Sequence, residues 1–335
     1  MFLVEQGADV NRTNRVGESP LHTAAIKGCS ELVNLLLDQG SNPNLQTLFK
    51  SSLTDCEEFR QTPLHLAIGC RQKEVIDALL DDDASNNNPF GESKRVRPDF
   101  NIKNSAGLTP LAAALSDNLP EIATTLLKGG ANVNVSDCNG NTLLHSSLID
   151  NNTDATLFLL NNGADVNIRS KNNQTCLELA ITKNMLAAVE ALCRLGADMS
   201  SSSGPDPPLW IALKTDPDLA SILVRYGVDT DCWSEGPDGC FQTLLHRAID
   251  ENNEDFAAFL VRCGCDLNSP RKVGPDGRGG DEAHDLASPL HLCCQWGLEI
   301  VVRTLLEHGA NKNAKVNSSV IQYAFATKYY HSNLA

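Results

Sequence analysis

The sequence predicts an all-α solenoid of stacked helix-turn-helix repeats, and three observations support this prediction. A phrase of the form Thr/Ser-Pro-Leu-His recurs along the chain, a second phrase of the form Gly-Ala-Asp-Val-Asn follows it, and both keep a basic period of 33 residues. Leu111, Leu144 and Leu177 are spaced by 33, as are Asn134 and Asn167. Two phrases with one shared period indicate a repeat architecture, in which each repeat buries its apolar face only by stacking on its neighbours.

The first phrase predicts the start of a short helix in each repeat. Thr or Ser accepts a free backbone N–H at the helix start, and Pro at the first helical position costs no hydrogen bond. The Leu and the small residues after it, as in Leu21 to Ala25, form the apolar face of this helix, and we expect Leu144 and Leu245 to be buried. Full or partial copies of the phrase begin at Ser19, Thr62, Thr109, Thr142, Thr175, Thr243 and Ser288, and Pro208-Leu209-Trp210 is a degraded copy.

A second helix and a protruding loop complete each repeat. The second helix carries an apolar stripe at helical spacing, as in Leu32, Val33, Leu35 and Leu36. The Gly of the closing phrase permits the left-handed residue that ends this helix, and the Asp or Asn after it suits a tight turn. The closing glycines are Gly7, Gly40, Gly130, Gly163, Gly196, Gly227, Gly264 and Gly309.

The repeat array spans residues 1–313, and residues 314–335 form a C-terminal tail without the repeat phrases. The array starts with a partial repeat at 1–11 and continues with about eight repeats. Because the leading repeat has no first helix, we interpret the chain as part of a longer array. We expect the second of three insertions to replace a closing phrase, and all three to project at the loop edge. These insertions lie near 46–58, 81–98 and 269–287.

These phrases resemble the ankyrin repeat, and the resemblance covers nearly the whole chain. It implies a protein-binding fold in which the His of the first phrase forms hydrogen bonds within and between repeats. Ala112, Glu178 and Trp210 stand where this His is expected, so we expect the third, fifth and sixth repeats to be looser or differently packed. The histidines that match the family motif are His22, His65, His145, His246 and His291.

The repeats from Gly107 to Asn167 and the stretch from Ser288 to Gly297 resemble, more narrowly, the middle section of a group of endosomal proteins. These proteins combine a BTB domain, a long ankyrin array and a lipid-binding FYVE zinc finger, and this sequence contains neither the BTB domain nor the FYVE spacing of Cys and His. The resemblance implies a cytoplasmic chain, peripheral to endosomes through parts or partners outside it. It also implies an effector of an early-endosomal Rab GTPase that acts in endocytosis and macropinocytosis.

Composition argues against several other classes of function. The chain has 27 Lys and Arg against 42 Asp and Glu, a net charge of −15, which disfavours binding to nucleic acid or to an anionic membrane. Its apolar runs are too short for a transmembrane helix. The 12 Cys form no paired CxxC motifs, so we expect neither a metal site nor a cofactor.

We also expect no catalytic residues. The five motif histidines share one phase of the repeat beside a helix cap, which indicates a structural position, and no phosphate-binding loop or nucleophile elbow occurs. The sequence therefore predicts a non-catalytic protein–protein interaction scaffold. Two alternatives stay open: a substrate-recruiting segment of a modular enzyme whose catalytic domain lies outside this chain, and a structural spacer.

Asn88, Pro89 and Phe90 form the tripeptide that EH domains of endocytic proteins recognise, and they lie inside the second insertion. Asn-Pro favours a turn that presents Phe90 outward. An EH-domain protein is therefore a candidate partner. The alternative is that Phe90 packs on the second helix of its own repeat.

The resemblance also makes the closing Asn residues candidate modification sites, because a cytosolic asparaginyl hydroxylase acts on ankyrin arrays. The pattern that this enzyme prefers has a Leu eight residues before the Asn, an acid two before and a Val one before. Asn167 and Asn11 fit this pattern, whereas Asn134 has Asn132 in place of the acid. A structural role, in which these Asn side chains hold the turn, is compatible with modification.

Overall fold

The computed structural model confirms the all-α repeat fold. Its described residues form 16 helices in eight pairs and two strands of three residues each, and we number the helix pairs repeats 1 to 8. The chain divides into two compact parts, Met1–Asn172 with repeats 1 to 4 and Asn173–Ala335 with repeats 5 to 8. The described residues are 7–48, 60–81, 95–137, 139–200, 204, 206–235, 241–272 and 287–314.

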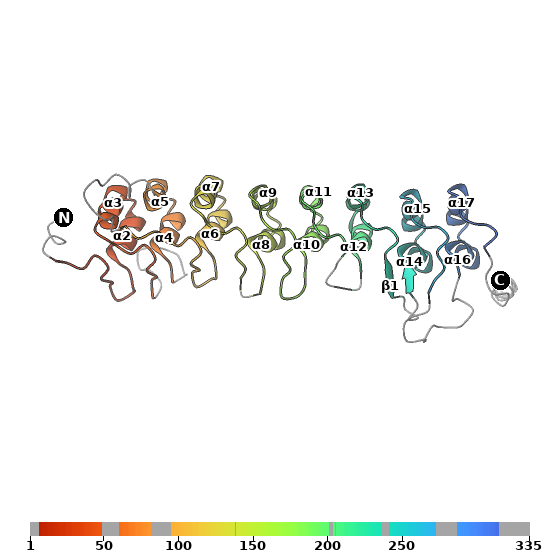
Figure 1. The fold of residues 1–335 in the computed structure, drawn as a ribbon, viewed down its shortest axis with the longest axis horizontal. Helices are drawn as coiled ribbons and strands as arrows, with labels where there is room; N and C mark the ends of the chain where they lie inside the picture. Colours follow the sequence, from red (N-terminus) through yellow and green to blue (C-terminus); the bar gives the residue numbers. More distant parts are fainter. Residues whose placement is uncertain are drawn as a thin grey trace, which may run out of the picture. The chain divides into compact units, whose positions relative to one another are not determined.

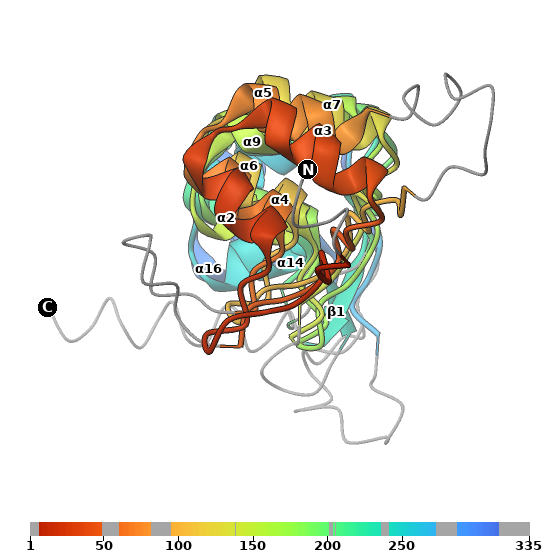
Figure 2. The same cartoon turned by 90° about the vertical axis from the view of Figure 1, so that its left-hand side faces the viewer.

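In the first part, the first helices of the repeats form one layer and the second helices form another (Figures 1 and 2). Helix α2 contacts α4 and α4 contacts α6, while α3 contacts α5 and α5 contacts α7. The closing loops leave on the side of the first helices (Figure 1). The helices are α2 (Pro20–Lys27), α3 (Ser30–Asp38), α4 (Pro63–Gly69), α5 (Lys73–Leu80), α6 (Pro110–Ser116), α7 (Pro120–Lys128), α8 (Leu143–Ile149) and α9 (Thr153–Asn161).

The second part repeats this two-layer arrangement. Helix α10 contacts α12 and α14 contacts α16 in one layer, while α11 contacts α13 and α15 contacts α17 in the other. A short antiparallel hairpin joins β1 (Trp233–Glu235) to β2 (Phe241–Thr243). The helices are α10 (Cys176–Thr182), α11 (Leu186–Arg194), α12 (Pro208–Thr215), α13 (Pro217–Arg225), α14 (Leu244–Asp250), α15 (Glu254–Arg262), α16 (Pro289–Trp296) and α17 (Glu299–Glu307).

The helix ends follow the capping chemistry of the two phrases. Thr62 Oγ1 accepts the backbone N–H of His65, and Pro63 is the first residue of α4. After the second helix, the closing glycine adopts the left-handed region, as at Gly163 with a φ of 81°. Between the two helices of repeat 4, Asn151 adopts the same region with a φ of 55°, a conformation that Asn tolerates better than most residues.

The leucines of the first phrase form the core of the array. Leu64 is 2% exposed and Leu144 and Leu245 are each 1% exposed, which confirms the predicted burial of the last two. The apolar stripe of the second helices is buried at positions such as Val33. Leu32 on the same helix is 44% exposed, because no described helix precedes repeat 1 to cover it.

The second insertion does not replace a closing phrase, and that expectation is wrong. A displaced closing turn follows the insertion, where the backbone N–H of Asn101 donates to the Asp99 carboxylate at 2.9 Å. Just before this turn, Arg95 Nε donates to Asp38 Oδ1 at 2.6 Å, and the Arg95 side chain is only 11% exposed. The described end of the insertion therefore packs on the second-helix layer rather than at the loop edge.

The third insertion begins at the loop edge, as expected. Lys272 pairs with Phe241 through two backbone hydrogen bonds of 2.8 and 3.0 Å, beside the β1–β2 hairpin. Arg271, which is buried, donates to Gln242 Oε1 at 3.2 Å and forms an ion pair with Asp250. These contacts hold the start of the insertion against repeat 7. No helix in the described part of the chain has the length and apolar character to span a membrane.

Candidate interaction surface

Two of the motif histidines, His22 and His65, bridge neighbouring repeats. His65 Nδ1 lies 2.8 Å from Thr62 Oγ1 in its own repeat, and Nε2 lies 3.1 Å from the carbonyl oxygen of Leu108 in the next repeat. His22 Nε2 lies 3.2 Å from the carbonyl oxygen of Gln61 in the same way. Burial lowers the pKa of His65 to about 4, so its imidazole is neutral at pH 7. These side chains have the structural role that the family resemblance implies.

The other motif histidines keep the contact within their own repeat. His145 Nδ1 lies 2.9 Å from Thr142 Oγ1, and His291 Nδ1 lies 2.7 Å from Ser288 Oγ. His246 Nδ1 lies 2.8 Å from the hydroxyl of its capping Thr, but its buried Nε2 has no hydrogen-bond partner among the described residues. Burial, together with the nearby charge of Arg271, lowers the pKa of His246 to about 4.

Repeat 6 is packed differently because Trp210 replaces the histidine. The indole ring is fully buried and meets Phe256 edge to face, with 5.6 Å between the ring centroids. The guanidinium of Arg247 lies 4.6 Å from the Trp210 ring centroid, and its Nη1 forms an ion pair with Asp206 at 2.7 Å. Arg247 and Phe256 belong to repeat 7, so this cluster joins repeats 6 and 7 by aromatic and ionic contacts.

Repeat 3 has lost the histidine bridge, and no described side chain replaces it. Leu108 O accepts two donors, His65 Nε2 at 3.1 Å and the Asn104 N–H at 2.9 Å. At the next joint, the corresponding carbonyl oxygen of Asn141 accepts the Asp137 N–H at 2.8 Å, and Ala112 has no second donor to offer. This outcome agrees with the looser packing that Ala112 led us to expect.

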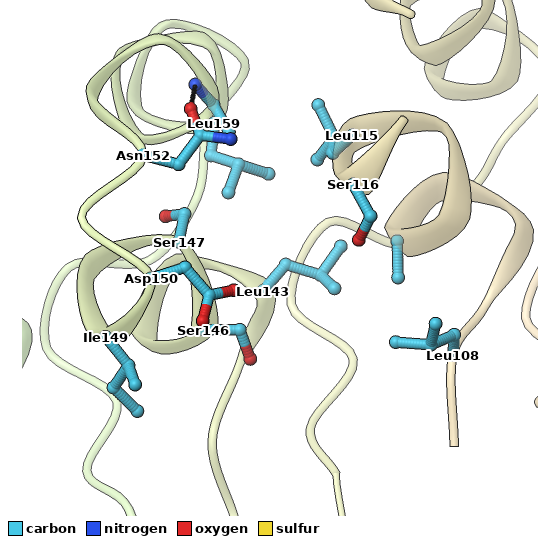
Figure 3. A pocket seen from close by; sticks show the side chains of 12 residues that line it. Leu108, Leu115, Ser116, Leu143, Ser146, Ser147, Ile149, Asp150, Asn152 and Leu159 are labelled. Atoms are coloured by element: carbon cyan, nitrogen blue, oxygen red, sulfur yellow. Dashed lines mark hydrogen bonds between the residues drawn. The ribbon is translucent and has the colours of Figure 1, made fainter. Parts of the chain in front are cut away.

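A cavity of about 260 Å³ lies at this joint, between α6 on one side and α8 and α9 on the other (Figure 3). Its walls are largely apolar. Leu108 precedes the helix cap of repeat 3, Ala112 and Leu115 belong to α6, Leu143 begins α8, and Leu159 comes from α9. Ala112 lacks the imidazole that repeats 1 and 2 direct toward the next repeat, and it contributes only a methyl group to the cavity wall.

The deep polar groups at the cavity are satisfied within the protein. Ser147 Oγ donates to the carbonyl oxygen of Leu144 at 3.0 Å and accepts a hydrogen bond from Thr156 Oγ1 at 2.9 Å. Asn152 Oδ1 accepts the backbone N–H of Ala155 at 3.0 Å and so caps α9 (Figure 3). These groups hold α8 and α9 together and need no external partner.

The groups nearer the cavity mouth are different. Among the described residues, the hydroxyls of Ser116 and Ser146 and the carboxylate of Asp150 have no hydrogen-bond partner. Ile149 also lines the cavity and is 42% exposed. Among the described residues, no Lys or Arg lines the cavity, so these residues give its mouth an apolar side chain, two hydroxyls and one negative charge.

The closing Asn residues form a ladder along the loop edge. The Asn134 carboxamide oxygen accepts the backbone N–H of Asp165 in the next repeat at 2.9 Å, and the Asn11 oxygen accepts that of Asn42 at 2.7 Å. A different side chain, two positions before each closing Asn, holds the turn itself. In repeat 4 the Asp165 carboxylate accepts the backbone N–H of Asn167 at 2.9 Å. The same link between repeats joins Asn44 to Asp99, Asn101 to Asn132, Asp231 to Asp266 and Asn268 to Asn311.

The predicted site residues stand as follows. Asn88, Pro89 and Phe90 lie outside the described residues. Asn11, Asn134 and Asn167 all occupy closing turns at the loop edge. In the described part of the chain, no group of three His, Cys, Asp or Glu has the arrangement of a metal site.

The cavity was not predicted as a site, although the sequence contained its signal. Ala112 breaks the Thr-Pro-Leu-His phrase, and Ser147 stands where the other first helices have a small apolar residue, as at Ala67 and Ala248. A missing bridge and a polar core residue at the same joint mark a change in packing. The sequence does not show whether the neighbouring helices close over the space that the missing side chain leaves.

Comparisons with known proteins agree with this architecture. The model for three ankyrin repeats matches residues 1–90, 45–137, 94–170, 111–203 and 177–271, and the single-repeat model matches 285–317. Rabankyrin-5 from Mus musculus is 48% identical over 328 residues, and Rabankyrin-5 from Homo sapiens is 48% identical over 327 residues. Both alignments cover 94% of this chain, which spans only 28% of the length of either relative.

The fold is also similar to a solved structure, the ankyrin repeat domain of Bcl-3, described as a unique member of the IkappaB protein family. The TM-score is 0.54 and the sequence identity is 27%, over 66% of this chain and 89% of the Bcl-3 chain. The repeat phrases, the helix pairs and the matches across most of the sequence lead to one conclusion. The chain belongs to the ankyrin-repeat family.

Proposed function

We propose that this chain is a non-catalytic protein-interaction scaffold within an endosomal trafficking effector. It would bind an early-endosomal Rab GTPase and act in endocytosis and macropinocytosis. The observation that carries the proposal is the 48% identity to Rabankyrin-5 over 94% of the chain. The bridging role of the histidines is in keeping with a scaffold, since their ring nitrogens serve packing within and between repeats.

The test is direct binding of the purified chain to a panel of Rab GTPases, each loaded with GDP or with a non-hydrolysable GTP analogue. An effector binds the GTP form, so we expect capture of one early-endosomal Rab in that form only. A fluorescently tagged chain in cells should accumulate on endosomes that carry the same Rab. Capture of no Rab in either form would favour one of the two alternatives, a structural spacer or the recruiting segment of a modular enzyme.

We also propose that Asn88, Pro89 and Phe90 recruit an EH-domain protein. The support is the tripeptide itself and its place in an insertion of the array. The test compares capture of an isolated EH domain by the wild-type chain and by Phe90→Ala, with Phe100→Ala as a control outside the tripeptide. Equal capture by wild type and Phe90→Ala, or no capture by either, would end this proposal.

The closing asparagines are proposed sites of hydroxylation, with Asn167 and Asn11 preferred over Asn134. The enzyme needs an extended chain, so the closing turn must open before modification. For Asn134 this means breaking its 2.9 Å hydrogen bond to the Asp165 N–H. Mass spectrometry of protein from oxygenated cells should show the mass of one added oxygen on the Asn167 peptide. Its absence when the hydroxylase is overexpressed would reject the proposal.

A further inference from the structure

We propose that the cavity between repeats 3 and 4 binds one apolar side chain of a partner protein, in a segment where Lys or Arg flanks that side chain. The inference rests on the proposed scaffold function and names a surface and a chemistry for it. The cavity lies between α6 and the α8–α9 pair (Figure 3), and Ser116 and Asp150 at its mouth are exposed.

One side chain distinguishes this joint from the two joints before it. At the joints after repeats 1 and 2, the imidazoles of His22 and His65 reach the carbonyl oxygens of the next repeat. Ala112 ends at Cβ, lines the cavity and offers no such bridge. The available site therefore coincides with a local departure from the repeat phrase.

The volume favours a side chain over a whole small molecule. Cavities for small-molecule ligands usually measure about 300–1,000 Å³, whereas an apolar cavity of about 150 Å³ accepts a benzene ring. The present volume of about 260 Å³ lies between these values. Leu108, Leu115 and Leu143 supply apolar walls, which suit a Leu, Met or Phe side chain from a partner.

The negative charge around the cavity mouth favours basic residues beside the inserted side chain of the partner. Asp150 lines the cavity, and Asp117 follows Ser116 at the end of α6, where it is exposed. No basic residue in the described part of the chain lines the cavity, and the chain as a whole has a net charge of −15. Lys or Arg beside the inserted side chain would face this negative rim, and the hydroxyls of Ser116 and Ser146 can accept their N–H groups.

The first experiment selects ligands without presupposing a partner. Short peptides of random sequence are displayed and selected against the full chain. Enriched peptides should share a Leu, Met or Phe next to Lys or Arg, and their affinity should weaken as salt rises, because rim charges are screened. Enrichment of acidic peptides, or no enrichment, would overturn the inference.

The second experiment measures binding of one enriched peptide to matched variants by fluorescence anisotropy. Ala112→His restores the family motif and fills the cavity, and we expect affinity to fall about tenfold or more. Asp150→Lys reverses the rim charge and should also weaken binding, with a smaller salt dependence than wild type. Glu307→Lys makes the same charge change on an exposed side chain of α17 that does not line the cavity, and should leave affinity unchanged.

Folding and function are separated by two further measurements. Ala112→His should unfold at a urea concentration equal to or above that of wild type, since its Nε2 would gain the Asn141 carbonyl as a partner. If this folded variant binds the peptide as tightly as wild type, the cavity is not the site. Binding of the Rab GTPase is then measured with the same variants. Rab binding without peptide binding would retain the proposed function and reject this inference, and the reverse result would retain the inference alone.

Discussion

Two kinds of single side chain join neighbouring repeats, one in the core and one at the loop edge. In the core, His65 bridges Thr62 and Leu108, and at the loop edge Asn134 accepts the Asp165 N–H. Each bond crosses the joint between repeats, so its loss weakens stacking rather than a helix. The His65 bridge is buried and uses a neutral imidazole, which avoids the cost of desolvating an ion, whereas the Asn134 bond is exposed.

Leucine truncations test the assignment of the core. Leu144→Ala and Leu245→Ala should each lower the free energy of unfolding by about 2–5 kcal/mol, because each buried side chain is only 1% exposed and its removal leaves a cavity. Urea denaturation followed by circular dichroism measures the change. Leu186→Ala, at a site 38% exposed, is the matched control and should shift the midpoint far less. Unmoved midpoints in the two core variants would contradict the assignment.

The bridging histidines predict how stability depends on pH. Burial lowers the pKa of His65 from 6.5 to about 4, so in that pH range the unfolded chain binds a proton that the folded chain does not. The free energy of unfolding is therefore unaffected by this group above pH 6.5 and decreases as the pH falls toward 4. The decrease is about 1.4 kcal/mol for each unit by which the pKa of His65 differs between the folded and the unfolded chain. The pKa values of His22, His246 and His291 are lowered as well, so the decline should be steep.

The measurement is the urea midpoint at several pH values between 7.5 and 5. His65→Gln should be less stable than wild type at neutral pH. It should lose less stability on acidification, because it lacks one imidazole whose pKa is lowered by folding. His308→Gln, at an exposed position after α17, should keep the wild-type slope. A wild-type slope in His65→Gln would show that this imidazole does not couple folding to pH.

At the scale of the helices, the sequence could predict the first helices but not every joint. A capping Thr or Ser marks the start of every described first helix except α12, and Leu144 and Leu245 are buried as predicted. The displaced closing turn at Asp99 was missed, because it lacks the Gly-Ala pair and follows an insertion. Its position depends on the hydrogen bond to Asn44 of the preceding repeat, a contact between residues far apart in the sequence.

At the joint between repeats 6 and 7, the contacts of Trp210 could not be predicted from the sequence either. The sequence indicated that Trp210 would change the packing, but its partners are set by the stacking of repeat 7. Phe256 approaches from α15 and Arg247 from α14, and both meet the indole ring of α12. The indole N–H has no hydrogen-bond partner among the described residues, so the joint depends on apolar and cation–π contacts rather than on a bridge.

Because of these contacts, we expect removal of the indole to lower the stability of the protein strongly. Trp210→Ala should lower the free energy of unfolding by about 3–5 kcal/mol, because a fully buried ring leaves a cavity and Arg247 loses its aromatic contact. Trp296→Ala is the matched control, since the Trp296 side chain is 57% exposed and its loss should change stability by about 0.5 kcal/mol or less. Urea denaturation followed by circular dichroism compares the two variants with wild type. A similar cost for both would contradict the stacked joint.

At the scale of the whole chain, acidic charge and local packing act together. The net charge of −15 is spread along the sequence, so the array repels anionic surfaces and attracts cationic segments over its length. Specificity must then come from places where the repeat pattern changes, because regular repeats present similar helix faces. The joint at Ala112 is one such place, since its cavity gives a cationic segment an apolar anchor.

Truncation tests whether the array folds through neighbour contacts. A chain that ends after Lys272 lacks α16 and α17 but keeps the described residues of repeats 1 to 7. Helices α14 and α15 lose their contacts with α16 and α17, while the described helices before them keep their own neighbours. Because stability in such arrays is roughly a sum over repeats and their interfaces, the shortened chain should stay helical and lose only the contribution of the last repeat and its joint. The helical circular dichroism signal should fall in proportion to the helices removed. The protection of α4 and α6 amides against hydrogen exchange should be unchanged. Loss of protection in α4 and α6 would show instead that the array folds as one cooperative unit, in which a distant repeat supports the joint where the cavity lies.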